Sequence, residues 1–262
     1  MMEAVIINLK RQPERRRYAI DECRRANIHP SIMDATDLRD LSEEWLQDNA
    51  SEIIIQNLKN DAYHSMNFGA LACADSHRRA WKEVRGRRIY PTLILEDDFI
   101  WLKSQGRVKA IIQSIAETDF DMVILGYSPR KPFLLDKSKG ISVSNDFVVL
   151  PYSQIQRTSG SFAYLIGRKA TEKLIAAQGM VIDREADDFA WEHQRQGNQL
   201  RIGFIFPPLV HHGLFDSSIW GTSNSWRSWF KRKVNMACLR SSLLRRIFSW
   251  LMAQRLRRRY VL

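Results

Sequence analysis

The chain has 262 residues, of which 45% are hydrophobic and 26% charged, and its net charge is +11. This composition is that of an ordinary globular protein, large enough for one domain or for one domain with an appendage. We find no internal repeat, no basic leader before an apolar core and no run of about 18 apolar residues, so we expect neither a signal peptide nor a membrane span.

The excess of basic residues is concentrated at the end of the chain. Residues 217–262 contain 11 of the 40 Lys and Arg residues and no Asp or Glu, so the rest of the chain is neutral. A basic surface over the whole body is typical of nucleic-acid-binding proteins, whereas a neutral body with a basic tail favours a localised anionic partner. The three cysteines, Cys23, Cys73 and Cys238, are odd in number and far apart, which favours a reducing compartment such as the cytoplasm.

The first half of the chain alternates short apolar runs with helical patterns. Ala4–Asn8 predicts a buried strand, and Pro13–Ala26 predicts a helix because proline suits its first position. Residues 32–60 are mixed and predict short helices. In Gly69–Val84, residues recur at helical spacing, which predicts a helix. Thr92–Leu95 predicts a second buried strand.

The second half of the chain continues this pattern. In chain order we expect strands at Asp121–Leu125, Phe147–Leu150 and Ser161–Ile166, a helix at Arg168–Ala177, and a last strand at Ile202–Phe206. This order of elements predicts an α/β sandwich with a largely parallel central sheet. In such sheets, ligands bind at the carboxyl ends of the strands.

Residues 223–262 predict a basic amphipathic helical tail, separate from a body of residues 1–222. Apolar residues recur every four positions at Leu239, Leu243, Ile247 and Leu251. Three partners fit such helices, namely an anionic membrane surface, a nucleic acid or a groove in another protein. Trp226, Trp229 and Trp250 favour the membrane interface, although the apolar residues could instead pack against the body.

Three consecutive acids, Glu96, Asp97 and Asp98, follow the predicted strand Thr92–Leu95 in the segment PTLILEDDFIW. Neighbouring carboxylates repel one another, and near an apolar interior they need a metal ion, basic side chains or water. In an extended segment, Glu96 and Asp98 point the same way and could share one ligand, while Asp97 turns to the other side. A hard divalent cation such as Mg²⁺ or Mn²⁺ suits these oxygens, and a solvated loop is the simpler interpretation.

Several segments between Ala4 and Ile219 resemble, in the same order, motifs of the family 25 glycosyltransferases. They are AVIINLKRQPERR, FGALACADSHRRAWKEV, PTLILEDDFIWL, SGSFAYLIGRKATEKLI, and ADDFAW with FPPLVHH. The resemblance implies a GT-A-like, Rossmann-type fold and an inverting enzyme that transfers a hexose, most often galactose from UDP-galactose. The bacterial members it resembles act on the core of lipopolysaccharide or lipooligosaccharide.

By this resemblance, Glu96-Asp97-Asp98 is a variant of the family's Asp-x-Asp motif. Asp98 is then the first choice for a ligand of Mn²⁺ or Mg²⁺, with Glu96 as a second ligand, and Glu96 or Asp97 would contact the donor ribose or a metal-bound water. His211 or His212 could complete the metal shell, since imidazole suits Mn²⁺. The family usually carries Gln near these histidines, so the chain departs from its pattern and metal dependence stays open.

An inverting transferase needs a general base that takes the proton of the acceptor hydroxyl. In the segment ADDFAW, Asp187 aligns with the family's Asp, and Asp188 is the alternative. Acids in this segment would also suit the positive end of a helix dipole.

The resemblance also assigns a donor-binding segment near the N-terminus. Asn8, Arg11 and Arg15 match it, and a helix N-terminus with an arginine suits a diphosphate or uracil. His77 could bind the donor phosphate or orient Asp98, and it could equally be a core histidine.

The resemblance and the tail together predict a location. A lipid-linked acceptor at the inner leaflet would lie within reach of a protein held peripherally on the inner face of the cytoplasmic membrane by its basic tail. Three other functions stay open: nucleic-acid binding through the tail, a metal-dependent phosphohydrolase using the same acids, and an inactive relative kept as a scaffold. The neutral body argues against the first, so we expect no nucleic-acid partner.

Overall fold

The computed structural model describes residues 2–59, 66–129, 135–154, 158–178, 181–188 and 200–212. The predicted tail, residues 223–262, lies outside the described residues, so its helices and the boundary after residue 222 stay predictions. Within the described residues, no helix is both long enough and apolar enough to cross a membrane.

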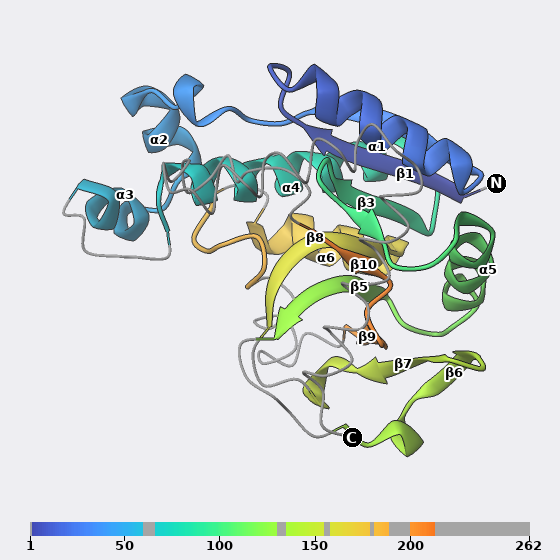
Figure 1. The fold of residues 1–262 in the computed structure, drawn as a ribbon. Helices are drawn as coiled ribbons and strands as arrows, with labels where there is room; N and C mark the ends of the chain where they lie inside the picture. The colour runs from blue at the N-terminus through green and yellow to red at the C-terminus, as the bar shows by residue number, and fades with distance from the viewer. Residues whose placement is uncertain are drawn as a thin grey trace, which may run out of the picture.

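A central sheet of eight strands carries the fold (Figure 1). Its strands are β1 Met2–Asn8, β2 Ile28–Asp34, β3 Thr92–Glu96, β5 Met122–Pro129, β6 Ile141–Ser144, β7 Phe147–Pro151, β8 Thr158–Ile166 and β9 Ile202–Phe206. They lie in the order β2-β1-β3-β8-β5-β9-β7-β6. A separate two-stranded sheet pairs β4 (Ile100–Trp101) with β10 (Val210–His211).

Most strands of the central sheet run in the same direction. β1 pairs in parallel with β2 and β3, and β5 pairs in parallel with β9. β8 runs antiparallel between β3 and β5, and β7 runs antiparallel between β9 and β6. The predicted α/β fold with a mostly parallel sheet is therefore confirmed, with β8 and β7 as its two reversed strands.

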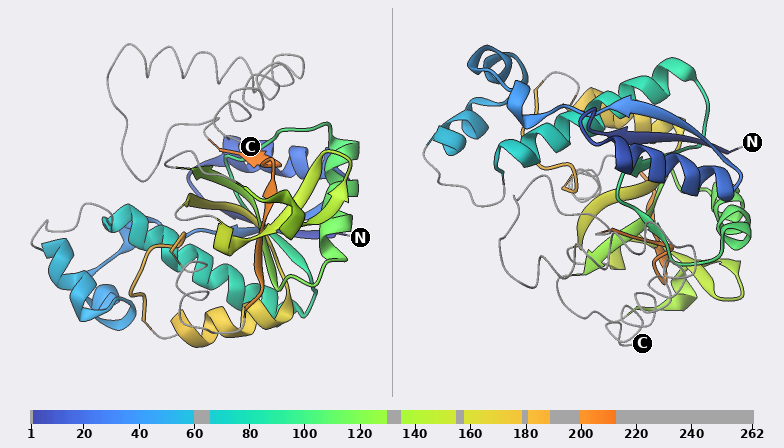
Figure 2. Two further views of the ribbon diagram at one scale, coloured as in Figure 1. Left: turned by 90° about the horizontal axis from the view of Figure 1, so that it is seen from below. Right: turned by 45° about the horizontal axis from the view of Figure 1, so that its top comes forward.

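Helices cover both faces of the sheet, as the two views of Figure 2 show. The four long helices are α1 Pro13–Arg25, α4 Phe68–Arg87, α5 Gln105–Ala116 and α6 Arg168–Gln178. α1 and α5 share one buried hydrophobic cluster with the sheet, and α4 and α6 share another on the opposite face. The shorter elements are α2 Glu43–Asn49, α3 Glu52–Lys59 and the 3-10 turns η1 Leu38–Asp40, η2 Lys137–Lys139 and η3 Tyr152–Gln154.

The alternation of side chains along β1 explains the two layers. Ala4 and Ile6 belong to the cluster under α1 and α5, whereas Val5 and Ile7 belong to the cluster under α4 and α6. Successive side chains of a strand point to opposite faces, so an uninterrupted apolar run serves both layers. This is why the sequence of β1 has no polar alternation.

Each of the strands and long helices expected from the sequence is present, but other elements were not predicted. β2 contains Pro30 and several polar residues, and only Ile28 and Met33 of this edge strand are buried. Proline is tolerated at sheet edges, so such a strand gives little periodic signal. α5, β6 and the two-residue strands β4 and β10 were also missed.

Candidate functional site

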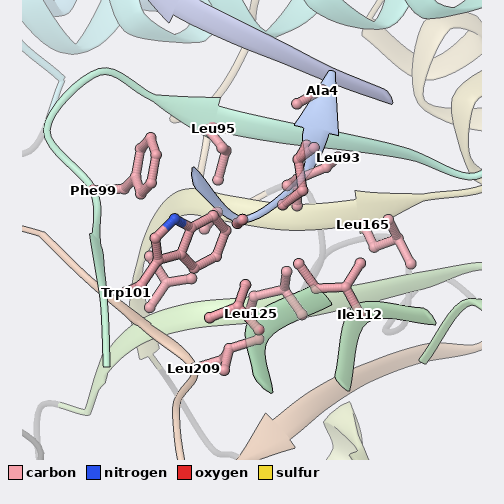
Figure 3. Close-up of a cluster of buried hydrophobic side chains, with 14 of the residues drawn as sticks. Ala4, Leu93, Leu95, Phe99, Trp101, Ile112, Leu125, Leu165 and Leu209 are labelled. Atoms are coloured by element: carbon pink, nitrogen blue, oxygen red, sulfur yellow. The ribbon is translucent and has the colours of Figure 1, made fainter. Parts of the chain in front are cut away.

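The three acids lie where β3 ends, as the sequence predicts. Glu96 is the last residue of β3, and Asp97 and Asp98 form the turn that follows. The chain is fixed directly after the turn, because Phe99 and Trp101 are buried and their rings meet edge to face at 4.9 Å (Figure 3). The acids are therefore held on rigid backbone at the carboxyl end of a central strand.

Asp97 turns toward the layer of α1. Its carboxylate accepts a 2.7 Å hydrogen bond from Nδ2 of Asn8 and lies 3.1 Å from Nη1 of Arg15. All three side chains are buried. Burial raises the pKa of Asp97 above its ordinary value, although Arg15 and Asn8 oppose the shift. The structure thus brings together three of the predicted donor-binding residues, and they contact one another.

Glu96 turns toward the opposite layer, that of α4. Oε1 of Glu96 lies 3.5 Å from Nε2 of His77, and Nδ1 of His77 lies 2.9 Å from the hydroxyl of Tyr164. Trp81 donates a 2.8 Å hydrogen bond to the same hydroxyl. Burial works to raise the pKa of Glu96, but His77 outweighs it and holds this pKa below its ordinary value. His77 is therefore both a buried histidine and a neighbour of the acids.

Asp98 is the acid whose charge is least compensated. Its Oδ1 is buried, and no hydrogen bond reaches that atom from the described residues. Burial, together with the charges of Glu96 and Asp97, raises the pKa of Asp98 to about 7. A buried carboxylate oxygen without a donor, beside two further acids, fits the oxygen ligand set of a hard divalent cation.

The histidine pair reaches the acids through the two-stranded sheet. His211 stands opposite Ile100 in the pairing of β10 with β4, two residues beyond Asp98. The rings of His211 and His212 stack with centroids 5.3 Å apart, and His212 packs on Phe162 at 4.5 Å. His212 also contributes to lowering the pKa of Glu96. The histidine pair thus lies beside β4, the strand that follows the acid turn.

Asp187 is anchored on β8. The backbone N–H of Gly160 donates a 2.9 Å hydrogen bond to Oδ2 of Asp187. Gly160 has a φ of +103°, and a Cβ at this position would collide with the ring of Phe162, so glycine is required here. Asp187 and Asp188 lie in a turn at the end of the described segment 181–188. Whether a helix follows lies outside the described residues.

Cys73 lies beside the acid turn, with its sulfur within 4.8 Å of a ligand atom of Glu96. Burial raises the pKa of its thiol well above the ordinary value, and the charges of Glu96, Asp187 and Asp98 add to the shift. No role was predicted for Cys73 from the sequence, although Cys73 stands four residues before His77 and so shares its helical face.

Arg11 is paired with Asp37, in the segment after β2. Its Nε lies 2.6 Å from Oδ2 of Asp37, which Arg39 also contacts at 2.7 Å. Hydrogen bonds from Arg39 and Arg11 hold the pKa of Asp37 well below its ordinary value, although burial opposes them. Asp37 helps to line a pocket of about 350 Å³, together with Ala35, Thr36, Asp40, Trp45, Asn49, Asp75, Arg78 and Arg79. This pocket was not predicted from the sequence.

Comparison with known families decides the membership of the chain. Residues 1–190 match glycosyltransferase family 25, described as an LPS biosynthesis protein. The chain belongs to glycosyltransferase family 25. The matched part contains the acid turn, His77 and Asp187, and it ends before β9 and the histidine pair. The family predicted from the sequence motifs is thereby confirmed.

Curated relatives in family 25 cover most of this chain. Procollagen galactosyltransferase 1-A of Xenopus laevis is 27% identical over 197 residues, which are 71% of this chain and 30% of that protein. Procollagen galactosyltransferase 2 of Homo sapiens is 26% identical over 179 residues, or 67% of this chain and 27% of that protein. Inactive glycosyltransferase 25 family member 3 of Mus musculus is 24% identical over 190 residues, or 71% and 31%.

The chain therefore spans only about three tenths of the length of these family 25 relatives. Among solved structures, the glycosyltransferase GlyE of Streptococcus pneumoniae TIGR4 aligns over 96% of this chain and 64% of that chain. The identity is 11% and the TM-score 0.30, which is too distant a likeness to support an argument.

Proposed function

We propose that this family 25 member is an inverting hexosyltransferase with a GT-A-like fold. In this proposal it moves galactose from UDP-galactose to a sugar of a lipopolysaccharide or lipooligosaccharide core. Two kinds of comparison support the choice of substrates. The family is described as an LPS biosynthesis protein, and two of the relatives reported above are named galactosyltransferases.

The acid turn at the end of β3 is the observation that carries the proposal. Ligands of α/β sheets bind at the carboxyl ends of strands, and the buried Oδ1 of Asp98 has no donor among the described residues. Asp98, Glu96 and one of His211 and His212 would hold Mn²⁺ or Mg²⁺. When bound, such a cation supplies charge neutralisation for the departing UDP.

The remaining residues would divide between donor binding and proton transfer. Asn8 and Arg15 orient Asp97, so they would act on the donor through the acid turn as well as directly. Arg11 would have to leave its ion pair with Asp37 to reach a diphosphate.

The general base would come from the segment after α6. Asp187, with Asp188 as the alternative, would take the proton of the acceptor hydroxyl while the new glycosidic bond forms. The hydrogen bond from Gly160 fixes the direction of the Asp187 carboxylate. This fixed direction supports Asp187 as the general base.

Product analysis tests the proposal. The full-length protein is incubated with UDP-galactose, Mn²⁺ and a core oligosaccharide acceptor, and the product is examined by mass spectrometry and by NMR for its anomeric configuration. We expect one added hexose in the β configuration, and no product from Asp98→Asn. Release of phosphate from simple esters without sugar transfer would replace the proposal with the phosphohydrolase alternative. No turnover of any donor would indicate an inactive member of the family. Such members exist, since the Mus musculus relative is named an inactive glycosyltransferase 25 family member.

The basic tail supplies the second part of the proposal. Residues 217–262 carry 11 basic residues and no acids, so this segment would bind the anionic inner leaflet and bring the enzyme to a lipid-linked acceptor. The protein would then be cytoplasmic and peripheral on the membrane.

A further inference from the structure

Cys73, His77 and Glu96 place three different ligand atoms close together. Cys73 and His77 lie four residues apart on one face of α4, and Glu96 ends the strand that α4 covers. One ligand atom from each residue lies within 4.8 Å of the other two. Nε2 of His77 is 3.5 Å from Oε1 of Glu96. A thiol, an imidazole and a carboxylate therefore converge on one point between a helix and a sheet.

The state of His77 is the second, independent observation. Its side chain is 0% exposed, and its Nε2 makes no hydrogen bond with the described residues. Nδ1 is in contact with the hydroxyl of Tyr164, which Trp81 holds in place. A histidine that binds a metal uses its other ring nitrogen for an outer hydrogen bond of this kind. The ring is thus oriented so that Nε2, which makes no hydrogen bond with the described residues, lies 3.5 Å from the carboxylate of Glu96.

The charges around the thiol favour a cation. The carboxylate of Glu96 lies beside the thiol, and Asp98 stands two residues further along the chain. Carboxylates next to a thiol attract a positive ion, and a bound divalent cation deprotonates the thiol that ligates it.

We propose that Cys73, His77 and Glu96 form a binding site for a thiophilic divalent cation of the Zn²⁺ class. Sulfur and nitrogen ligands select Zn²⁺ over the harder Mg²⁺ and Mn²⁺, so this site differs in metal preference from the oxygen site at Asp98, with which it shares Glu96. Three protein ligands leave the fourth tetrahedral position for water.

The spacing of the ligand atoms is compatible with this geometry. The bond lengths of tetrahedral Zn²⁺ place its ligand atoms about 3.3 to 3.6 Å apart, which the separation of His77 and Glu96 already matches. The sulfur of Cys73 lies within 4.8 Å of the other two ligand atoms, so it would have to move closer to coordinate the ion. A cation bound here ties α4 to the end of β3, and it stabilises the fold independently of any transfer reaction.

The test uses Co²⁺ as a spectroscopic probe on the full-length protein after removal of metals with a chelator. We expect one equivalent of Co²⁺ to give a sulfur-to-cobalt charge-transfer band and the intense visible bands of a tetrahedral site, both abolished by Zn²⁺. Cys73→Ser should lose the charge-transfer band, whereas Cys23→Ser, at a buried cysteine of α1, should keep it. A charge-transfer band that survives in Cys73→Ser would overturn the assignment.

Two further measurements keep the proposal testable if Cys73→Ser folds poorly. X-ray absorption of the Zn²⁺-loaded parent protein should show one sulfur ligand, and a spectrum with oxygen and nitrogen alone would contradict the site. Tyr164→Phe removes the outer partner of His77, so it should weaken Zn²⁺ binding by about 10- to 100-fold. Unchanged affinity in this variant would mean that His77 is not a ligand. Because each readout is metal binding, failure of this site leaves the proposed transferase function standing.

Discussion

The carboxylate of Asp97 and the guanidinium of Arg15 form an ion pair at 3.1 Å, with 6% and 7% of the two residues exposed. This pair joins α1 to the turn that follows β3 and so fixes the position of the neighbouring acids. Arg16, the next residue of α1, makes a comparable but exposed pair. Its Nη1 lies 4.0 Å from Oδ1 of Asp34, and both side chains are about half exposed.

Removing one partner of the buried pair should destabilise the protein strongly. Arg15→Met leaves the Asp97 carboxylate buried without its cation, and we expect the free energy of unfolding in urea to fall by about 3 to 5 kcal/mol. The matched control Arg16→Met breaks an exposed pair and should change it by about 1 kcal/mol or less. Equal losses in the two variants would show that the Asp97 pair is not a structural anchor of the acid turn.

Asp187→Asn tests the general base. The amide cannot take a proton from the acceptor, yet it keeps the shape and the oxygen that Gly160 contacts, so transfer should stop while UDP-galactose still binds. We expect kcat to fall by at least about 100-fold, the lower end of what a general base contributes. Gly160→Ala should also lower kcat, because a Cβ collides with Phe162 and displaces the N–H that anchors Asp187. Full activity in Asp187→Asn would move the role to Asp188 or to another residue.

Asp98 makes stability depend on pH. Its pKa in the folded protein is raised from 3.8 to about 7, so the folded state holds this proton more tightly than the unfolded chain does. Stability is therefore lost as the pH rises from about 4 to 7, and the loss persists above that pH. Asp98→Asn removes the buried charge and should raise the free energy of unfolding at pH 8 by about 1 to 3 kcal/mol.

The comparison is made in a metal-free buffer, with Asp146→Asn as a control at an exposed acid. Near pH 4 the advantage of Asp98→Asn should disappear, because Asp98 is then protonated in the folded parent. Added Mn²⁺ should stabilise the parent protein but not Asp98→Asn, since only the parent offers the carboxylate. A variant that is less stable than the parent at pH 8 would mean that Asp98 is paired in solution.

The sequence placed the acid turn correctly because the local signals agree. A short apolar run predicts a buried strand, and the acids that follow it must lie at the strand end. The expected alternation of the three acid side chains requires an extended segment, whereas Asp97 and Asp98 form a turn. Even so, Asp97 faces α1 and Glu96 faces α4, as the argument expected.

The parts of the site that sequence reasoning missed depend on contacts between distant segments. The ribbon of β4 and β10 has only two residues in each strand, too few for any periodic pattern, and it joins residues 100–101 to 210–211. The reversed direction of β8 is equally hidden, because a strand buried on both faces gives the same apolar run in either direction. Likewise, the role of Tyr164 in orienting His77 follows from a pairing across 87 residues.

The proposed membrane location is tested by shortening the tail. Deletion of the residues after Ser225 removes all 11 basic residues of the segment 217–262. Because each basic residue near an anionic surface contributes about 1 kcal/mol, we expect the full-length protein to cosediment with phosphatidylserine vesicles and the shortened protein to stay in solution. A variant with Gln at Arg255, Arg257, Arg258 and Arg259 should bind with intermediate strength. Cosedimentation that is unchanged by the deletion would contradict membrane binding through the tail.

Donor binding tests the central claim most directly. The purified full-length protein is titrated calorimetrically with UDP-galactose, UDP-glucose and UDP-N-acetylglucosamine, with and without Mn²⁺, and the titrations are repeated with Asp98→Asn. We predict that UDP-galactose binds most tightly, that Mn²⁺ strengthens its binding, and that Asp98→Asn removes the contribution of the metal. Absence of binding for all three nucleotide sugars, or UDP-galactose binding that neither Mn²⁺ nor Asp98→Asn alters, would contradict a metal-assisted donor site at the end of β3.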